Sequence, residues 1–164
     1  MQSLLIVYHS DTGGTLQMVR AAQEGAHAAE PALDLRLMHA DAAGPDDVLA
    51  ADGYLFATPE NLAAICGVVK RFFDRTYYAA LDRIVGRPYA AMICAGSDGT
   101  NAARQVERIA TGWRLKAIAP ALIVCTHAQT PAEIAKAKCI LPADGERCRE
   151  LGATLASGLA LGIF

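Results

Sequence analysis

The sequence lacks the marks of several protein classes. Its 15 lysine and arginine residues against 17 aspartate and glutamate residues leave a formal net charge of −2, so there is no basic excess to neutralise nucleic-acid phosphates. No apolar run reaches the ~20 residues of a membrane-spanning helix. The N-terminal stretch has no basic region of the kind that opens a signal peptide. We therefore expect a cytoplasmic protein without a nucleic-acid or membrane partner.

Cysteine is present but not in pairs. The five cysteines, Cys66, Cys94, Cys125, Cys139 and Cys148, are an odd number with no CxxC spacing. The absence of this spacing excludes a zinc ribbon and a thioredoxin-type redox pair, and the odd number of cysteines disfavours a disulfide framework. We expect reduced thiols and no metal site.

The 164 residues, 53% of them hydrophobic, suit a single domain over residues 1–164 with one core. Short apolar runs alternate with longer amphipathic ones. The pattern predicts strands at 3–8, 33–38, 53–57, 88–94 and 121–125, with 33–38 as a half-exposed edge strand. It predicts helices at 15–29, 43–50, 63–81, 101–112 and 144–161, and a short helix capped by Thr130 within 130–141.

This alternation indicates an α/β protein with a mostly parallel sheet between two helical layers. In such folds ligands bind at the carboxyl ends of the strands. The loops that follow the first, third and fourth strands are therefore the candidate site.

The first loop is rich in hydroxyls and glycine and contains no lysine or arginine: Ser10, Asp11, Thr12, Gly13, Gly14 and Thr15. Glycines allow a ligand close to the backbone, and the following helix start offers free N–H groups for a phosphate. The loop lacks the lysine of a nucleotide P-loop and the GxGxxG of a dinucleotide site. The alternative is an ordinary turn with a helix N-cap.

The other two loops carry Thr58, Pro59, Glu60, Asn61, Leu62 and Ala63 after the third strand, and Ala95, Gly96, Ser97, Asp98 and Gly99 after the fourth. Small residues there would let a planar ring approach backbone donors. A plain turn is again the alternative for the third loop.

Residues 10–15 match the Ser/Thr-x-Thr-Gly-x-Thr phosphate loop at every fixed position, and in this they resemble the flavodoxin superfamily. Thr58, Pro59, Gly67, Lys70 and Phe72, with Asp74, Arg75 and Thr76, resemble in register the branch of NAD(P)H-dependent FMN reductases and tryptophan-repressor-binding-protein-like proteins. The resemblance implies a flavodoxin-like three-layer α/β/α sandwich with a five-stranded parallel sheet in the order 2-1-3-4-5. It implies FMN as cofactor, held by the three loops, with NAD(P)H as electron donor and a quinone or other small molecule as acceptor.

The sequence departs from that family pattern at Asn61-Leu62-Ala63-Ala64, where the family places an aromatic residue and a Gly-Asn pair along the flavin. The alternative function is therefore a non-catalytic flavodoxin-like module, either a one-electron carrier or a degenerate interaction domain.

We expect Asp11 to point to solvent, because a carboxylate near a phosphate is unfavourable. Helix packing is the expected role of Cys66, one turn into the third helix.

Other proteins with this layout are excluded by single residues. The third strand ends in Phe56-Ala57-Thr58, without the aspartate of a receiver domain, and no cysteine at a strand exit is followed by the arginine of a small tyrosine phosphatase. The GxSxG elbow of a hydrolase is also missing.

His9 and His127 follow predicted strands and are candidate proton donors, although locally bonded histidines are commoner. An apolar last helix and the aromatic face of helix 63–81 favour a homodimer.

Overall fold

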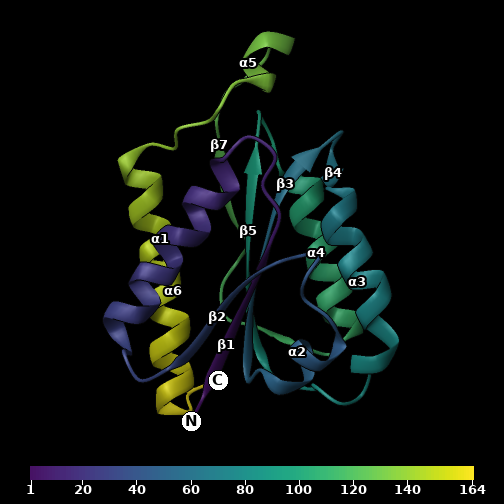
Figure 1. The fold of residues 1–164 in the computed structure, drawn as a ribbon, viewed down its shortest axis with the longest axis vertical. Coiled ribbons are helices and arrows are strands. Elements are labelled where there is room, and N and C mark those ends of the chain that lie inside the picture. Colours follow the sequence, from purple (N-terminus) through teal and green to yellow (C-terminus); the bar gives the residue numbers. More distant parts are fainter.

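The computed structural model describes residues 1–164, in which strands and helices alternate along the chain (Figure 1). In chain order the elements are β1 (Ser3–Tyr8), α1 (Gly14–Ala29), β2 (Asp34–His39), α2 (Pro45–Ala50), β3 (Gly53–Asn61), β4 (Ala64–Ile65), α3 (Gly67–Ala80), β5 (Pro88–Ala95), α4 (Thr100–Gly112), β6 (Lys116–Ala117), β7 (Leu122–Cys125), α5 (Pro131–Ala135) and α6 (Pro142–Leu161).

The sheet has the expected strand order. Its strands run β2-β1-β3-β5, and β6 and β7 both pair with β5 on its other side. All of these pairs are parallel, and only the short β4 is antiparallel, to β3. The predicted strand at 121–125 is β7, and the short β6 before it was not predicted. The segment between β6 and β7 contains Pro120, which has no N–H for a ladder. The order 2-1-3-4-5 is confirmed, with seven strand segments instead of five.

Helices cover both faces of the sheet and divide the core into two halves. The side chains of β1 alternate between them: Leu4 and Ile6 pack with residues of α1 and α6, whereas Leu5 and Val7 pack with residues of α2, α3 and α4. All four are fully buried. The continuous apolar run of β1 is thus explained by a strand that is covered on both faces.

Helices α1 and α6 lie side by side on one face of the sheet (Figure 1). A Cβ on Gly25 would lie 2.0 Å from the carbonyl oxygen of Arg149, and one on Gly152 would lie 2.0 Å from that of Ala22. The two helices are therefore in backbone contact at these glycines. The apolar side of α6 faces α1 and the sheet, with Leu151, Leu155 and Leu159 buried.

The predicted helix at 63–81 begins later than expected, at Gly67. The strand before it continues to Asn61 and turns back into β4. Leu62 and Ala63 form this turn with φ angles of 51° and 60°, the left-handed values of a two-residue hairpin. Gln105 of α4 accepts the N–H of Ile65 at 2.9 Å, a contact that a local apolar pattern cannot predict. Cys66 is the N-cap of α3 and is buried, not one turn inside the helix.

The remaining elements follow the predictions within a few residues. β2 is a half-exposed edge strand. Thr130 caps α5, accepting the N–H of Glu133 at 3.3 Å, with Pro131 at the first helical position. The short α5 stands above the carboxyl ends of the strands, away from the two helical layers (Figure 1). None of the helices has the length and apolar character that crossing a bilayer requires.

Candidate functional site

A cleft of about 570 Å³ opens at the carboxyl ends of the strands, within the usual size range of ligand sites. The phosphate loop (residues 10–15), the β3–β4 hairpin, the end of β5 and the segment after β7 surround it. Its lining residues are Ser10, Asp11, Thr12, Gly14, Thr15, Pro59, Glu60, Asn61, Leu62, Cys94, Ala95, Gly96, Ser97, Thr126, Ala128, Gln129, Ile134 and Lys138.

The phosphate loop presents free backbone donors at the start of α1. The hydroxyl of Ser10 accepts the N–H groups of Gly13 and Leu16, both at 3.2 Å, which holds the loop in a closed turn. The remaining N–H groups of the loop donate to no other group of the chain, and they belong to Ser10, Asp11, Thr12, Gly14 and Thr15. Together with the positive end of the α1 dipole, they form a site suited to an anion.

At both glycine positions of the loop, the structure disfavours a residue with a side chain. Gly13 is the N-cap of α1 and has a φ of 94°, which other residues rarely adopt. A Cβ on Gly14 would lie 2.5 Å from Sγ of Cys94 on β5. Burial raises the pKa of the Cys94 thiol, and a hydrogen bond with Thr15 partly offsets this effect. Cys94 is therefore a neutral packing residue beneath the loop.

The segment after β7 also reaches the loop, a contribution that the sequence analysis missed. The backbone N–H of Lys138 donates to the carbonyl of Thr12 at 2.8 Å. The side-chain amide of Gln17 donates to the carbonyls of Gly13, at 2.9 Å, and Lys138, at 2.7 Å. The Lys138 ammonium donates to three carbonyls around the end of α5, those of Glu133, Ile134 and Lys136. The cleft thus has a cation beside a loop that itself contains none.

Six lining residues were absent from the predicted site: Cys94, Thr126, Ala128, Gln129, Ile134 and Lys138. Five of them follow the strand at the edge of the sheet. Because parallel strands bring their carboxyl ends to one edge, the loop after the fifth strand carried the same positional signal as the other three. No motif in the sequence marks it.

The expectation that Asp11 points to solvent is wrong in part, because its carboxylate is hydrogen-bonded within the protein. Its carboxylate accepts hydrogen bonds from Asn61 of the hairpin at 3.1 Å and from His9 at 2.8 Å, and its side chain is 47% exposed. The hydrogen bonds from Asn61 and then from His9 hold the pKa of this carboxyl below its usual value. An ionised carboxylate thus lines the cleft and joins the phosphate loop to the hairpin.

The hairpin forms another wall of the cleft with Pro59, Glu60, Asn61 and Leu62. Leu62 at its tip is fully exposed. The Oε2 atom of Glu60 is buried and has no hydrogen-bond partner in the chain. A buried acceptor without a donor is unfavourable unless a ligand supplies one. Glu60 is therefore the clearest position in this wall for a ligand N–H or O–H group.

The predicted residues that do not line the cleft have local roles. Asp98 accepts the N–H of Thr100 at 3.3 Å and Gly99 is the N-cap of α4 with a φ of 82°, so half of the third loop is the plain turn that was the alternative. Thr58 is buried and accepts the N–H of Cys66 at 3.2 Å. Ala63 lies in the hairpin turn, and Gly13 is the N-cap of α1. Ala95, Gly96 and Ser97 line the cleft as predicted.

The sheet order, the layers and the position of this cleft define a flavodoxin-like α/β protein. Solved flavodoxin-like structures superpose on nearly the whole chain. A flavodoxin from the domain Archaea matches with a TM-score of 0.80 at 18% identity, covering 97% of this chain and 99% of that one. A flavodoxin described as WrbA-like from Agrobacterium tumefaciens matches with a TM-score of 0.75 at 19% identity, covering 98% and 99%. The predicted fold class is confirmed.

The chain belongs to the NADPH-dependent FMN reductase family, whose model matches residues 39–129, more than half of the sequence. This family consists of FMN-binding oxidoreductases with a flavodoxin-like fold, in agreement with the resemblance found in the sequence. The matched stretch contains the hairpin and the third loop and begins after the phosphate loop.

Two relatives are similar in sequence over part of the chain. A flavodoxin of Aquifex aeolicus is 34% identical over 99 residues, which are 60% of this chain and 53% of the relative. An NAD(P)H dehydrogenase (quinone) of Acidithiobacillus ferrooxidans is 33% identical, covering 46% of this chain and 48% of the relative. The chain thus spans about half the length of each of these relatives.

Proposed function

We propose that this chain binds FMN in the cleft and transfers electrons from NAD(P)H to a quinone or another small acceptor. The observation that carries the proposal is the set of free backbone N–H groups at residues 10, 11, 12, 14 and 15 at the start of α1. A phosphate satisfies several such donors at once and gains from the helix dipole. Membership of the NADPH-dependent FMN reductase family supports the choice of cofactor and donor.

The residues present fit the rest of the cofactor. Beyond the phosphate loop the cleft is bounded by the hairpin and by Ala95, Gly96 and Ser97, whose small side chains leave the backbone accessible. The isoalloxazine ring carries one imide N–H, and the unpartnered Oε2 of Glu60 is an acceptor for such a donor. Leu62 would contact the ring by its apolar side chain. Asp11, Asn61 and Lys138 would surround the cofactor without closing the cleft.

The division of labour follows from this fit. Bound FMN supplies the hydride and electron chemistry. The protein supplies the anchor for the phosphate and the apolar and polar walls that orient the ring. No side chain of the cleft is required as a nucleophile.

A flavin titration tests the proposal. Quenching of FMN fluorescence by the protein is the expected result, with weaker binding of FAD. Thr12→Ala and Gly13→Val should each weaken FMN binding, the valine because its Cβ disfavours the φ of 94° at Gly13. A matched control is Gly67→Ala, where an added Cβ meets nothing within 4 Å. Absence of quenching at tens of micromolar protein would overturn the proposal.

A one-electron carrier or an interaction domain is the second candidate function. It is favoured by the hairpin, where Leu62 and Ala63 replace the aromatic and glycine residues of the family pattern, and by the similarity to a flavodoxin. Anaerobic mixing of the FMN-loaded protein with NADPH separates the two. Bleaching of the flavin band within seconds supports a reductase, and an unchanged band supports a carrier.

The proposals of a homodimer and of a cytoplasmic location stand on the sequence. Phe72 and Phe73 of α3 and the apolar side of α6 are buried in the fold, so the exposed Tyr78 on α3 is the residue that would suit a dimer contact. Sedimentation of the purified chain measures its mass in solution and decides the oligomeric state.

A further inference from the structure

Two histidines form a hydrogen-bonded pair at the edge of the cleft. His9 follows β1 and His39 ends β2, and the two strands are neighbours in the sheet. Nδ1 of His9 lies 2.8 Å from Nε2 of His39, and Nε2 of His9 lies 2.8 Å from Oδ1 of Asp11. The backbone N–H of Asp41 donates to Nδ1 of His39 at 3.3 Å. A continuous chain of hydrogen bonds thus runs from Asp41 to the carboxylate that lines the cleft.

The direction of each hydrogen bond in this histidine network (Asp41, His39, His9, Asp11) follows from its ends. Asp11 is an acceptor, so Nε2 of His9 carries a proton and Nδ1 of a neutral His9 is an acceptor. His39 must then donate from Nε2, and its Nδ1 accepts the backbone N–H of Asp41. Both rings are neutral in this arrangement, and every ring nitrogen is used.

The network has one place for an additional proton. A proton on Nδ1 of His39 replaces a long hydrogen bond of 3.3 Å and faces Oδ2 of Asp41 at 3.9 Å. A second proton would have to enter the 2.8 Å gap between the rings, where Nε2 of His39 already carries one. The geometry therefore allows the pair to bind one proton and opposes two.

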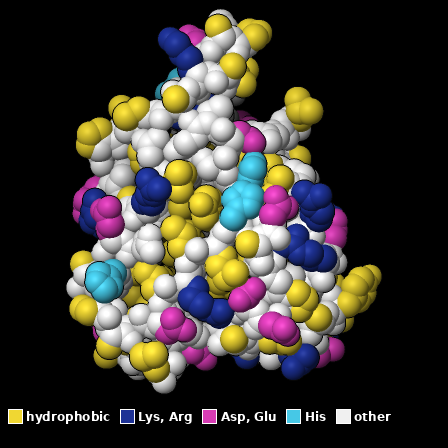
Figure 2. All heavy atoms as spheres, viewed as in Figure 1, with side chains coloured by type: hydrophobic (Ala, Val, Ile, Leu, Met, Phe, Trp, Pro, Cys, Tyr) yellow, Lys and Arg dark blue, Asp and Glu magenta, His cyan; other side chains and the backbone are white.

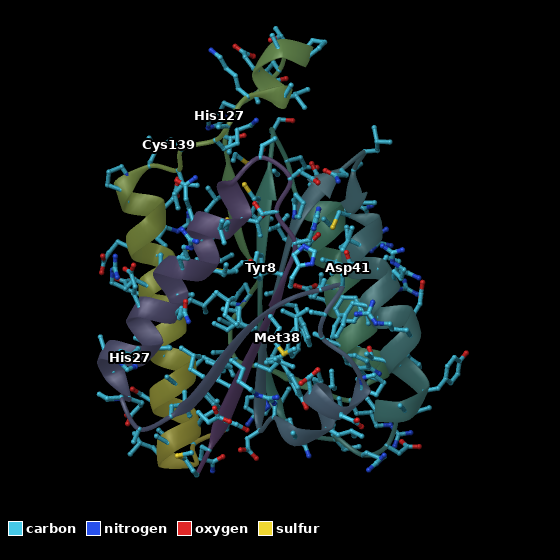
Figure 3. The ribbon with its side chains drawn as sticks, in the orientation of Figure 1. Tyr8, His27, Met38, Asp41, His127 and Cys139 are labelled. Carbon is cyan, nitrogen blue, oxygen red and sulfur yellow. The ribbon has the colours of Figure 1, made fainter.

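The two histidines of the network differ in their exposure to water. The side chain of His9 is 17% exposed, whereas that of His39 is 39% exposed. In Figure 2 histidine and acidic side chains lie next to one another on the face shown. In Figure 3 Tyr8 and Asp41 lie close to each other near the middle of this face, and the ring of Tyr8 packs edge-on against His39. Protons can thus enter at His39 while His9 connects to the cleft.

The charges around the pair come from several elements. Asp11 and Asp41 are the two carboxylates, and Asn61 of the hairpin bonds the first of them. From α3, Arg71 pairs with Asp41 at 3.2 Å and Arg75 bonds the carbonyls of residues 40 and 43. Asp41 is therefore shared between Arg71 and His39.

We propose that the histidine network takes up one proton when the cleft gains negative charge, and so couples electron transfer to proton transfer. This inference rests on the proposed function, because the charge enters with electrons from NAD(P)H. Asp11 lines the cleft and is joined through His9 to His39, the positioning residue that takes up the proton. Histidine suits this role because its charge changes near neutral pH.

The steps balance in atoms and charge. A hydride passed from NAD(P)H to FMN held in the cleft would bring two electrons and one proton, hence one negative charge, and would leave NAD(P)⁺. Water supplies the compensating proton to Nδ1 of His39. When the hydride passes to a quinone, that proton returns to water and the quinone anion takes up a proton. The sum is NAD(P)H, quinone and one proton giving NAD(P)⁺ and hydroquinone.

The first experiment needs no cofactor. Nitrogen-15 NMR of the histidine rings in the FMN-free protein, titrated from pH 5 to 8, should show the pair gaining one proton in total. His39→Gln keeps a side-chain donor toward Nδ1 of His9 but removes the Nδ1 atom that accepts the additional proton, so this variant should gain no proton over the same range. Full protonation of both rings within this range in the wild-type protein would overturn the inference.

The second experiment measures the midpoint potential of bound FMN against pH. Uptake of one proton with two electrons adds about 30 mV per pH unit to the slope, so the wild-type slope should exceed that of His39→Gln by up to this amount. His27→Gln is the matched control, since His27 is exposed on the outer side of α1 (Figure 3) and should keep the wild-type slope.

The outcomes distinguish the two proposals. Equal slopes in the wild type and His39→Gln, with FMN bound in both, would overturn the proton coupling and leave the proposed function intact. Failure of the wild-type protein to bind FMN would overturn the proposed function and the coupling together. A loss of slope in His39→Gln with an unchanged FMN dissociation constant supports the coupling and excludes a merely structural role.

Discussion

The carboxylate of Asp11 accepts a hydrogen bond from the side-chain amide of Asn61 at 3.1 Å, across 50 residues of sequence. This contact joins the phosphate loop to the β3–β4 hairpin at one end of the cleft. It also explains why a carboxylate is tolerated in a loop suited to anions. The charge of Asp11 is held by two side-chain donors, Asn61 and His9.

Removing this contact should lower stability in a pH-dependent way. The pKa of Asp11 is lowered by Asn61 and His9, so its contribution is present above the ordinary value of 3.8 and is lost as pH falls through the folded-state pKa. Asn61→Ala should reduce the free energy of unfolding at pH 7 by about 1 kcal/mol or less, because the pair is half exposed. Urea unfolding at pH 7 and pH 3 checks this, and a difference that grows in acid would contradict it.

Gly14 should tolerate no side chain. Its added Cβ would lie 2.5 Å from Sγ of Cys94, so Gly14→Ala should destabilise the protein by about 1–3 kcal/mol, as overpacking does, and weaken FMN binding. Adding Cys94→Ala removes the clashing sulfur and should restore most of both losses. Thermal unfolding and flavin titration of the single and double variants measure this. A double variant as impaired as Gly14→Ala would show that another contact is responsible.

Substitutions in the hairpin turn should increase the stability of the protein. Leu62 and Ala63 have φ angles of 51° and 60°, which favour Asn-Gly in a two-residue turn. The double substitution Leu62→Asn with Ala63→Gly should raise the free energy of unfolding by up to about 1 kcal/mol, since left-handed strain is relieved. Ala79→Gly, on the exposed side of α3, should instead lower it by about 1 kcal/mol. Urea unfolding at neutral pH gives both values, and equal signs would refute the argument.

The five thiols should differ in reactivity. Cys139 is exposed, whereas Cys66, Cys94 and Cys148 are buried. Burial raises the pKa of Cys148 to about 11 and also raises that of Cys94, so few reactive thiolates form there at pH 8. Alkylation followed by mass spectrometry should label Cys139 first, and Cys139→Ser should remove the fast phase. A fast phase that persists in this variant would show that a second thiol is accessible.

The strands, most helices and the phosphate loop can be predicted from local sequence patterns. Ser3–Tyr8 is apolar at nearly every position, and such a run predicts a strand that is buried on both faces. The loop at residues 10–15 is predicted from its own residues, because a loop that opens a helix presents its N–H groups there. Its contacts with Lys138 and Asn61 come from distant segments and are not predicted.

The hairpin, the position of Lys138 and the histidine network depend on long-range contacts. Residues 63–65 suit a helix as well as a strand, and Gln105 of α4 selects the strand. Lys138 reaches the loop, and His39 reaches His9, only because parallel strands far apart in the sequence end at one edge of the sheet. No local pattern contains these pairings. They depend on strand order, and strand order is a property of the folded chain.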